Sequence, residues 1–413
     1  MMHDAIIIGG GHNGLVCAAY LAQAGLDVLL LERREVLGGA CVTEELFPGY
    51  RFSACSYYCH LLQTKVIDDL ELRRHGFEVS HINPQKCYVF PDGRALFLWD
   101  SVEQTQESLA PFSSHDARAY PRWVAFWKRA AGLIHPYFLT PPPTIGEVYA
   151  GLRTREDREL LDTLLTTSMR DLVREYFEDE AVRGAFIHAH DVGDSAAAGS
   201  AWCLAYIKCN ELTPHANIGI VTGGMGGITQ AMAASARSRG ATLRTGVGVS
   251  GVLVENGTAG GVRLANGDEI RSRVVISNAD PKRTLLGLIE EEHLPAEFLS
   301  RVRRLRTATA YLKFTPRSTG SLISPGTSPP ALRSGTWPTR GSVHRSATSN
   351  APGTTPGTAA HRRRLCWTSR SPPATMPRWR PAASTSCPSG ACTRPCTSPR
   401  AAGTANGARS ANA

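Results

Sequence analysis

The chain has 413 residues, which is too long for one ordinary hydrophobic core and predicts two or more domains. Its composition, 42% hydrophobic and 20% charged, is that of a globular protein, and no apolar run of about 18 residues predicts a membrane span. The net charge of +9 does not indicate a nucleic-acid partner. Residues 315–413 hold 13 Arg and no Lys, Asp or Glu, which leaves −4 for residues 1–314.

The N-terminus shows no targeting signal. Residues 1–5 contain no basic region and no small-residue cleavage site, so a secretory leader is not predicted. We therefore expect a cytoplasmic location, where thiols stay reduced. Peripheral contact with a membrane surface remains open.

The first elements predict a dinucleotide-binding unit. Residues 5–8 are an apolar run typical of a buried parallel strand, and residues 9–14 follow as G-x-G-x-x-G. Residues 15–24 have helical spacing, and residues 28–31 predict a second strand that ends at Glu32. Strand, glycine loop, helix, strand and acid in this order are far more specific than the glycine motif alone.

Each motif residue has a predicted task. Gly9 permits the tight turn, Gly11 lets backbone approach a pyrophosphate, and Gly14 lets helix and strand pack closely. The helix N-terminus, with His12 beside Gly11, offers N–H groups and a positive dipole to the phosphates. Glu32 is predicted to accept hydrogen bonds from the adenosine ribose hydroxyls.

The continuation after Glu32 favours FAD over NAD. A second glycine pair, Gly38 and Gly39, resembles the extended dinucleotide motif of FAD enzymes that include amine oxidases, protoporphyrinogen oxidases and phytoene desaturases. It would let the chain pass close to the phosphates and the ribityl chain of the cofactor. The predicted cofactor-binding residues of the two motifs are Gly9, Gly11, His12, Asn13, Gly14, Glu32, Arg33, Gly38, Gly39 and Ala40.

The middle of the chain is less regular. Residues 111–137 predict an amphipathic helical segment that carries three large aromatic residues, Trp123, Phe126 and Trp127. Such residues pack in a core more often than they line a substrate box, so we expect a core role.

A second glycine-rich block predicts the other half of the nucleotide unit. Residues 223–227 open a helix over residues 228–238. Strands are predicted over residues 241–245, 246–254, 261–264 and 270–276, with turns at Asn256-Gly257 and Asn266-Gly267. An ordinary β-meander is the alternative for this block taken alone.

Together, residues 1–314 resemble the phytoene desaturase-like group, and most closely the pyridine nucleotide-disulfide oxidoreductase domain-containing protein 2 family. The matching stretches are GGGHNGL, LERREVLGGA, FSSHDARAYPRW, GGMGGITQA and VVISNADP. The resemblance implies an α/β fold in which a Rossmann-like FAD-binding domain of the glutathione reductase/amine oxidase type is interrupted by an α+β substrate domain. It also implies that Val249 backbone meets the adenine and that Asn278 lies near the adenosine.

The expected division has five parts. They are the first part of the FAD domain, the substrate domain, the second part of the FAD domain, a return segment and a tail, at residues 1–75, 76–215, 216–290, 291–314 and 315–413.

The tail differs in composition from everything before it. Residues 315–413 hold 14 of the 26 Pro and lack Tyr and Phe as well as Gln. Arg without Lys, beside Ala, Pro and Gly, is typical of GC-rich codons read out of register. We predict an out-of-frame, disordered tail in place of the family's closing FAD segment; a genuine disordered basic tail is the alternative. Cys387, Cys392 and Cys396 lack a second group at metal-site spacing, so no metal is predicted.

The family name suggests a redox disulfide, which the residues do not support. The position five residues after Cys41 is Leu46, Cys55 and Cys59 have the wrong spacing for such a pair, and Cys17 lies inside the first predicted helix. His60 is expected to be structural.

The predicted function is hydride transfer from a small lipophilic substrate to FAD, with a quinone or O₂ as electron acceptor. No residue is identifiable as a general base, so the catalytic residues stay unknown; Arg51 and Tyr57 are candidates for facing the substrate. With the closing segment missing, the chain is expected to be inactive. The alternative is a non-catalytic FAD-binding or interaction protein.

Overall fold

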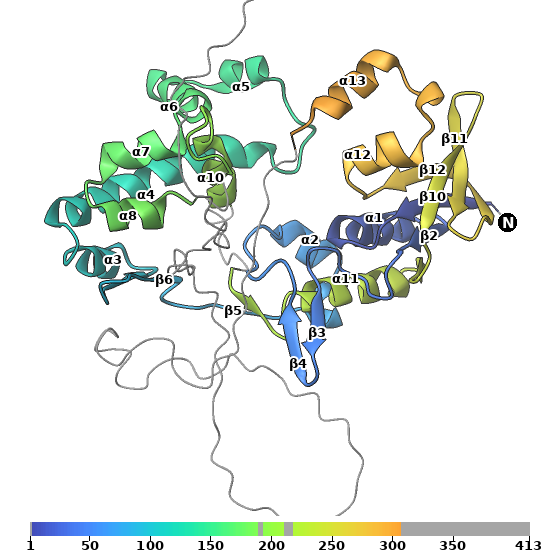
Figure 1. Ribbon diagram of the computed structural model, residues 1–413, viewed down its shortest axis with the longest axis horizontal. Coiled ribbons are helices and arrows are strands. Elements are labelled where there is room, and N and C mark those ends of the chain that lie inside the picture. Colours follow the sequence, from blue (N-terminus) through green and yellow to red (C-terminus); the bar gives the residue numbers. More distant parts are fainter. Residues whose placement is uncertain (1, 189–192, 210–217, 307–413) are drawn as a thin grey trace, which may run out of the picture. The chain divides into compact units, whose positions relative to one another are not determined.

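The computed structural model describes residues 2–188, 193–209 and 218–306 (Figure 1). The predictions made for residues 315–413, including the three tail cysteines, lie outside the described residues. Within the described ranges, no helix is both long and apolar enough to cross a membrane.

A six-stranded sheet with the order β10-β11-β12-β1-β2-β9 forms the nucleotide half of the fold. Its four strands β12, β1, β2 and β9 run parallel, whereas β10, β11 and β12 form an antiparallel meander. Their bounds are His3–Ile8 (β1), Val28–Leu31 (β2), Thr242–Arg244 (β9), Val249–Glu255 (β10), Thr258–Leu264 (β11) and Glu269–Ser277 (β12).

The sheet confirms the predicted α/β class, but two predicted strand starts were wrong. Strand β11 begins at Thr258 rather than at residue 261. The strand predicted from residue 246 begins at Val249. Gly246 has a φ of +70° and donates its N–H to the Arg34 carbonyl at 3.0 Å, so residues 246–248 turn beside β2 before the meander starts. The predicted hairpin at Asn256-Gly257 is present, and both residues have the positive φ that a tight hairpin turn requires.

Two helices, α1 (His12–Gln23) and α11 (Gly226–Ser238), pack together on one face of this sheet. Side chains at alternate positions of β1 and β2, such as Ile7 and Leu30, join Leu15 of α1 and Met232 of α11 in one buried cluster. The residues between them, such as Ile6, face the opposite cluster built with the meander. The strands are thus buried on both faces, which explains their continuous apolar sequence.

Two short helices, α2 (Thr64–Asp69) and η1 (Leu72–His75), extend the first cluster. After the meander, the described chain ends in three short helical turns and one helix. These are α12 (Pro281–Arg283), η4 (Thr284–Leu288), η5 (Glu291–His293) and α13 (Ala296–Arg304).

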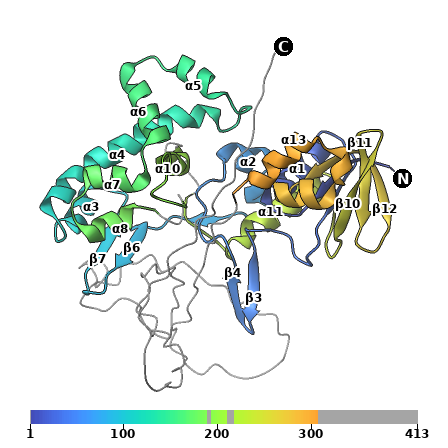
Figure 2. The same cartoon turned by 45° about the horizontal axis from the view of Figure 1, so that its top comes forward.

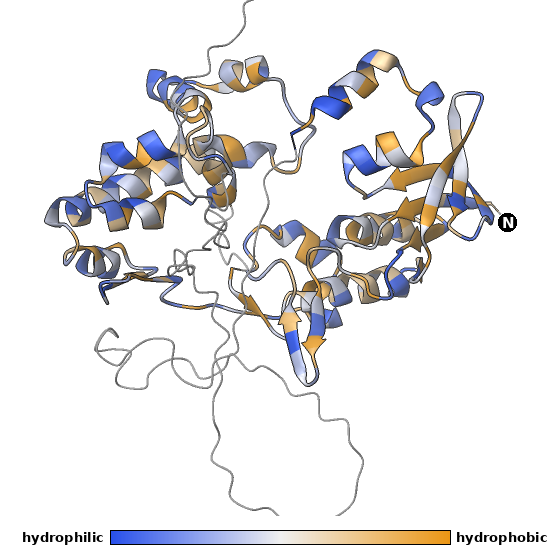
Figure 3. Ribbon diagram, in the orientation of Figure 1, coloured by the Kyte–Doolittle hydropathy of each residue, from blue (hydrophilic) through white to orange (hydrophobic). Residues whose placement is uncertain are grey.

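The middle of the chain is mainly helical and has its own core. Its helices are α3 (Val102–Leu109), α4 (Ser114–Ile134), η2 (His135–Tyr137), α5 (Ile145–Gly151), α6 (Arg155–Thr166), α7 (Met169–Tyr176), α8 (Glu180–Phe186) and α10 (Ala201–Lys208). Figure 3 shows hydrophobic and hydrophilic stretches alternating along these helices, as expected for amphipathic helices that share a core. Trp123 and Trp127 of α4 are buried in that core and Phe126 is partly buried, which confirms the predicted core role.

Three two-stranded sheets complete the described chain: β3 (Thr43–Phe47) with β4 (Tyr50–Ser53), β5 (Val79–Ser80) with β8 (Ile220–Val221), and β6 (Lys86–Val89) with β7 (Ala95–Leu98). Figures 1 and 2 show β3 and β4 as a two-stranded ribbon, and Phe47 near its tip is 64% exposed.

Helix α4 contains Pro121, which a neighbouring helix accommodates. Proline has no N–H, so the carbonyl of Ala117, four residues earlier, loses its helical hydrogen bond. The side chain of Gln106 on α3 supplies the missing donor, since its Nε2 donates to the Ala117 carbonyl at 2.8 Å. The Gln106 side chain therefore replaces the backbone hydrogen bond that Pro121 removes from α4.

Candidate cofactor site

The glycine turn between β1 and α1 has the geometry that its sequence predicts. Gly9 has a φ of +99° and donates its N–H to the Leu31 carbonyl at 2.8 Å. A Cβ added to Gly14 would lie 2.3 Å from the Gly9 carbonyl oxygen, which no side chain can tolerate. Both glycines are therefore required by the backbone itself.

The N-terminus of α1 has no side-chain cap. Gly11 is the N-cap and supplies no side-chain cap, and the first turn of this 12-residue helix carries no acidic residue. The helix itself thus places no acidic side chain at the positive end of its dipole, where an anion would be stabilised.

His12 stands at this helix end with one unpaired ring atom. Its Nδ1 is buried and has no hydrogen-bond partner among the described residues. Burial lowers the pKa of His12, so the ring is neutral at neutral pH. Asn13 follows and is exposed.

Glu32 connects the end of β2 to the glycine turn. It is only 8% exposed, and its two carboxylate oxygens accept from the Gly10 N–H at 2.8 Å and the Arg34 N–H at 2.9 Å. These bonds fix the carboxylate, and each oxygen retains a lone pair for a ligand hydroxyl. Arg33 is exposed.

The second glycine pair crosses directly over the first motif. Gly38 donates its N–H to the Gly10 carbonyl at 2.8 Å, and a Cβ on Gly39 would lie 3.0 Å from Gly11 Cα. Gly38 and Gly39 also have positive φ values, +137° and +56°. The backbones of the two glycine motifs are therefore in direct contact. Ala40, the residue after Gly39, is exposed.

The downstream glycine block packs against the same segment. Gly226 at the start of α11 donates its N–H to Thr43 Oγ1 at 2.9 Å, and Thr229 donates its hydroxyl to the Cys41 carbonyl at 2.7 Å. A Cβ on Gly226 would lie 2.7 Å from the Thr43 nitrogen. Small residues here serve close packing; Thr229, which the sequence interpretation missed, carried no motif signal.

The two downstream candidates lie in different places. Val249 is half-buried at the first position of β10 and pairs with Leu264. Asn278 follows β12 directly and lies against the glycine turn, where its backbone N–H donates to the Ile8 carbonyl at 2.8 Å. Contact of Val249 with an adenine remains a prediction.

The thiols near the glycine crossing are poor nucleophiles. Burial is the main cause that raises the pKa of Cys59 to about 12 and raises the pKa of Cys41 above its ordinary value, and burial alone raises that of Cys17. All three are free thiols. Arg51 is exposed on β4, and Tyr57 and His60 are half-buried; substrate contact by Arg51 or Tyr57 remains a prediction.

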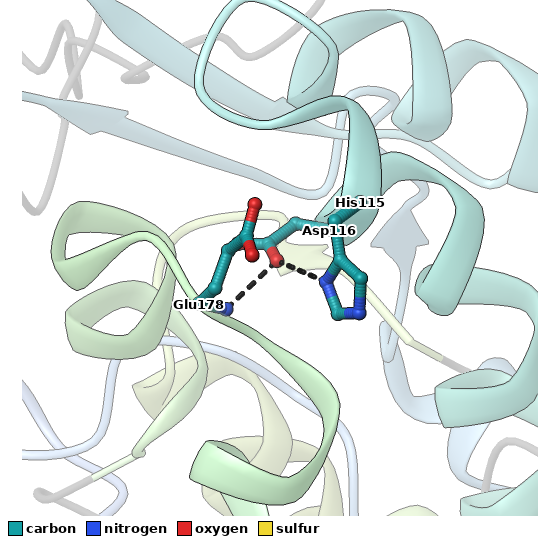
Figure 4. A group of neighbouring side chains, drawn as sticks. All are labelled: His115, Asp116 and Glu178. Carbon is teal, nitrogen blue, oxygen red and sulfur yellow. Dashed lines mark hydrogen bonds and ion pairs between the residues drawn. The ribbon is translucent and has the colours of Figure 1, made fainter.

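A separate acidic group on α4 has a structural explanation. Asp116 is fully buried, and its two oxygens accept from the backbone N–H groups of Glu178 and Asp179 at 2.8 and 3.0 Å. Figure 4 shows Asp116 between the His115 ring and the Glu178 backbone nitrogen. Asp116 thus joins the start of α4 to the turn before α8, and we propose no metal ion here.

The sequence profile described as flavin containing amine oxidoreductase matches residues 14–342. The chain belongs to this family. The cofactor is therefore FAD.

Among curated proteins, the chain is 33% identical over 342 residues to the pyridine nucleotide-disulfide oxidoreductase domain-containing protein 2 of Rattus norvegicus, covering 75% of this chain and 59% of that protein. It is 26% identical to a limonene dehydrogenase subunit of Castellaniella defragrans, covering 70% of this chain and 54% of that protein. It is 27% identical to the hydroxyneurosporene desaturase of Cereibacter sphaeroides, covering 69% and 57%. The chain spans less than two thirds of the length of each of these relatives.

A solved structure of wild-type putrescine oxidase bound to putrescine has a TM-score of 0.51 to this chain at 17% identity, covering 73% of this chain and 63% of that one. This likeness supports the fold.

Proposed function

We propose that the chain is built for FAD-dependent removal of hydrogen from a lipophilic substrate, as a desaturase or dehydrogenase. The observation that carries the proposal is the crossing of Gly38 and Gly39 over the turn of Gly9 and Gly11, which an NAD-only fold does not need. The relatives named as a limonene dehydrogenase subunit and a hydroxyneurosporene desaturase support the direction of the reaction and an apolar substrate.

The residues fit the adenosine diphosphate part of FAD. The open end of α1 and the unpaired His12 Nδ1 suit a pyrophosphate, and the buried Glu32 carboxylate suits the ribose hydroxyls. When bound, the cofactor would supply a hydride acceptor for the oxidation of a substrate C–H bond, with a proton lost from the neighbouring carbon to solvent and a quinone or O₂ as the final acceptor of the two electrons.

The protein's own part in this reaction is binding and exclusion of competing chemistry. Raised pKa values keep the thiols of Cys41 and Cys59 protonated at neutral pH, so they do not compete as nucleophiles. We assign no residue as general base.

We further propose that this chain retains FAD weakly and does not turn over. By resemblance, the family's last segment returns to the FAD domain, and the composition of residues 315–413 does not suit that task. A non-catalytic FAD-binding or interaction protein is the second candidate function.

The test is a titration of the purified chain with FAD, followed by flavin fluorescence and absorbance, with NAD as the competing ligand. Saturable FAD binding, weakened in Glu32→Ala and unchanged in the exposed control Glu107→Ala, supports the site. Anaerobic bleaching of the flavin by a terpene or polyene would support the proposed reaction and contradict the proposed inactivity of this chain. Tight binding of NAD with no flavin binding would contradict the proposal.

A further inference from the structure

Asn278 contacts the glycine turn, although 269 positions separate it from Gly9 in the sequence. It follows β12, which pairs in parallel with β1, so the ends of both strands meet at this turn. Its backbone N–H donates to the Ile8 carbonyl at 2.8 Å, and its side-chain Nδ2 donates to the Gly9 carbonyl at 3.5 Å.

Asn278, by its side chain and its backbone, is the residue nearest to the space that Gly9 and Gly11 leave empty. A Cβ added to Gly11 would lie 2.9 Å from Asn278 Nδ2, and the next nearest atom, Gly39 Cα, would be 3.9 Å away. A Cβ on Gly9 would find its three nearest atoms in Asn278, at 3.7 to 3.8 Å. Gly14 differs, because its Cβ would lie closest to the Gly9 carbonyl oxygen, at 2.3 Å, with Asn278 Nδ2 second at 3.1 Å.

We propose that Asn278 is a positioning residue that holds the glycine turn in its cofactor-binding shape, and that Gly11 lacks a side chain in order to admit the Asn278 amide. This inference deepens the proposed function and rests on it for the identity of the ligand. Asn278 then acts on the pyrophosphate region through the turn, rather than by touching the adenosine as the family resemblance implied.

The proposal requires that a side chain at position 11 destabilises the fold because it meets Asn278. This effect should be present even when no ligand is bound. Gly11→Ala should lower the melting temperature of the FAD-free chain, because the new methyl group meets the amide. Asn278→Ala removes the amide, so the double variant should melt above Gly11→Ala alone.

Gly14→Ala is the matched control. Its methyl group would lie 2.3 Å from the Gly9 carbonyl oxygen, which Asn278→Ala does not remove, and 3.1 Å from Asn278 Nδ2. The same second change should therefore give much less recovery than it gives in Gly11→Ala. Additive effects of Gly11→Ala and Asn278→Ala, or equal recovery at both glycines, would overturn the proposal.

A binding measurement separates positioning from general stability. Asn278→Ala should raise the Kd for FAD about tenfold, the scale of one lost hydrogen bond to an ordered group. Asn278→Asp is nearly isosteric, but it places an oxygen against the Gly9 carbonyl, so it should bind FAD no better than Asn278→Ala.

Unchanged FAD affinity in Asn278→Ala, with a wild-type chain that binds FAD, would overturn the proposal. A wild-type chain that binds no FAD would count against the proposed function instead. The melting comparison needs no ligand, so it decides the role of Asn278 in that case too.

Discussion

Glu32 orders the cofactor turn before any ligand arrives. Its carboxylate accepts two backbone N–H groups, from Gly10 and Arg34, and both would lose their partner in Glu32→Ala. We expect this variant to weaken FAD binding by about 1–3 kcal/mol and also to lower the melting temperature of the FAD-free chain. Titration and thermal unfolding, beside the exposed Glu107→Ala, measure the two effects; unchanged FAD affinity would exclude the ribose role.

His12 makes stability depend on pH in a defined direction. Burial lowers its pKa below the ordinary 6.5, so the folded ring releases its proton more readily than the unfolded one. Between the two values the unfolded chain binds more protons, and stability therefore rises with pH until it levels off above about 6.5.

His12→Gln should flatten this rise, measured as the melting temperature between about pH 5 and 7. His81 provides a comparison of opposite sign. Its hydrogen bond to Asp100 is the first cause that raises the pKa of His81, so its contribution is full below the unfolded value and is lost as pH rises through the folded one. An unchanged slope in His12→Gln would show that the His12 ring titrates as it does in the unfolded chain.

At the scale of elements, the hydrogen bond from Gln106 on α3 to the Ala117 carbonyl on α4 predicts that substitutions of Gln106 and Pro121 are energetically coupled. Gln106→Ala would leave the Ala117 carbonyl without its donor and should destabilise the chain by about 1–3 kcal/mol. Pro121→Ala restores the backbone N–H at that position, so Gln106→Ala should cost much less in the Pro121→Ala background. Denaturant unfolding of the four chains measures this coupling, and equal costs in both backgrounds would contradict it.

Sequence patterns predicted the elements better than the contacts between them. The turn from Gly9 to Gly14 and the amphipathic run of α4 are local signals, because period and glycine spacing act within a few residues. Asn278 and Gln106 act on backbone far along the chain, and neither position carried a pattern that indicates its partner. The buried Asp116 is similar: its role depends on the turn at Glu178, which only the packed helices bring near.

At the scale of the whole molecule, the central strand β12 exposes an apolar side chain to solvent. Val274 of β12 is 51% exposed, although its register partner Ala5 on β1 is buried. The described residues thus leave the α1 side of β12 partly uncovered, and exposed apolar surface favours association.

Val274→Thr keeps the β-branched shape and adds a hydroxyl. We expect it to raise the concentration at which the chain aggregates, followed by light scattering, with little change in melting temperature because the side chain is half in water. Val28→Thr is the buried control and should destabilise. Unchanged aggregation in Val274→Thr would show that this surface is not the cause.

The change of composition after residue 314 predicts a change of reading frame. Sequencing the gene around the codons for residues 314–318 should reveal an insertion or deletion relative to a longer frame that continues the family pattern. An uninterrupted frame, together with the intact mass of a natural protein that ends at Ala413, would refute this prediction.

The position of β1 between β12 and β2 also has a consequence for synthesis on the ribosome. The turn at Gly9 cannot acquire its Asn278 contact until 269 further residues have been added. At roughly 5–20 residues per second, this delay is about a quarter of a minute to a minute. During that time β1 and β2 are apolar strands without β12, so a nascent chain stalled before Glu269, the first residue of β12, should remain sensitive to protease at its N-terminus and should bind chaperones.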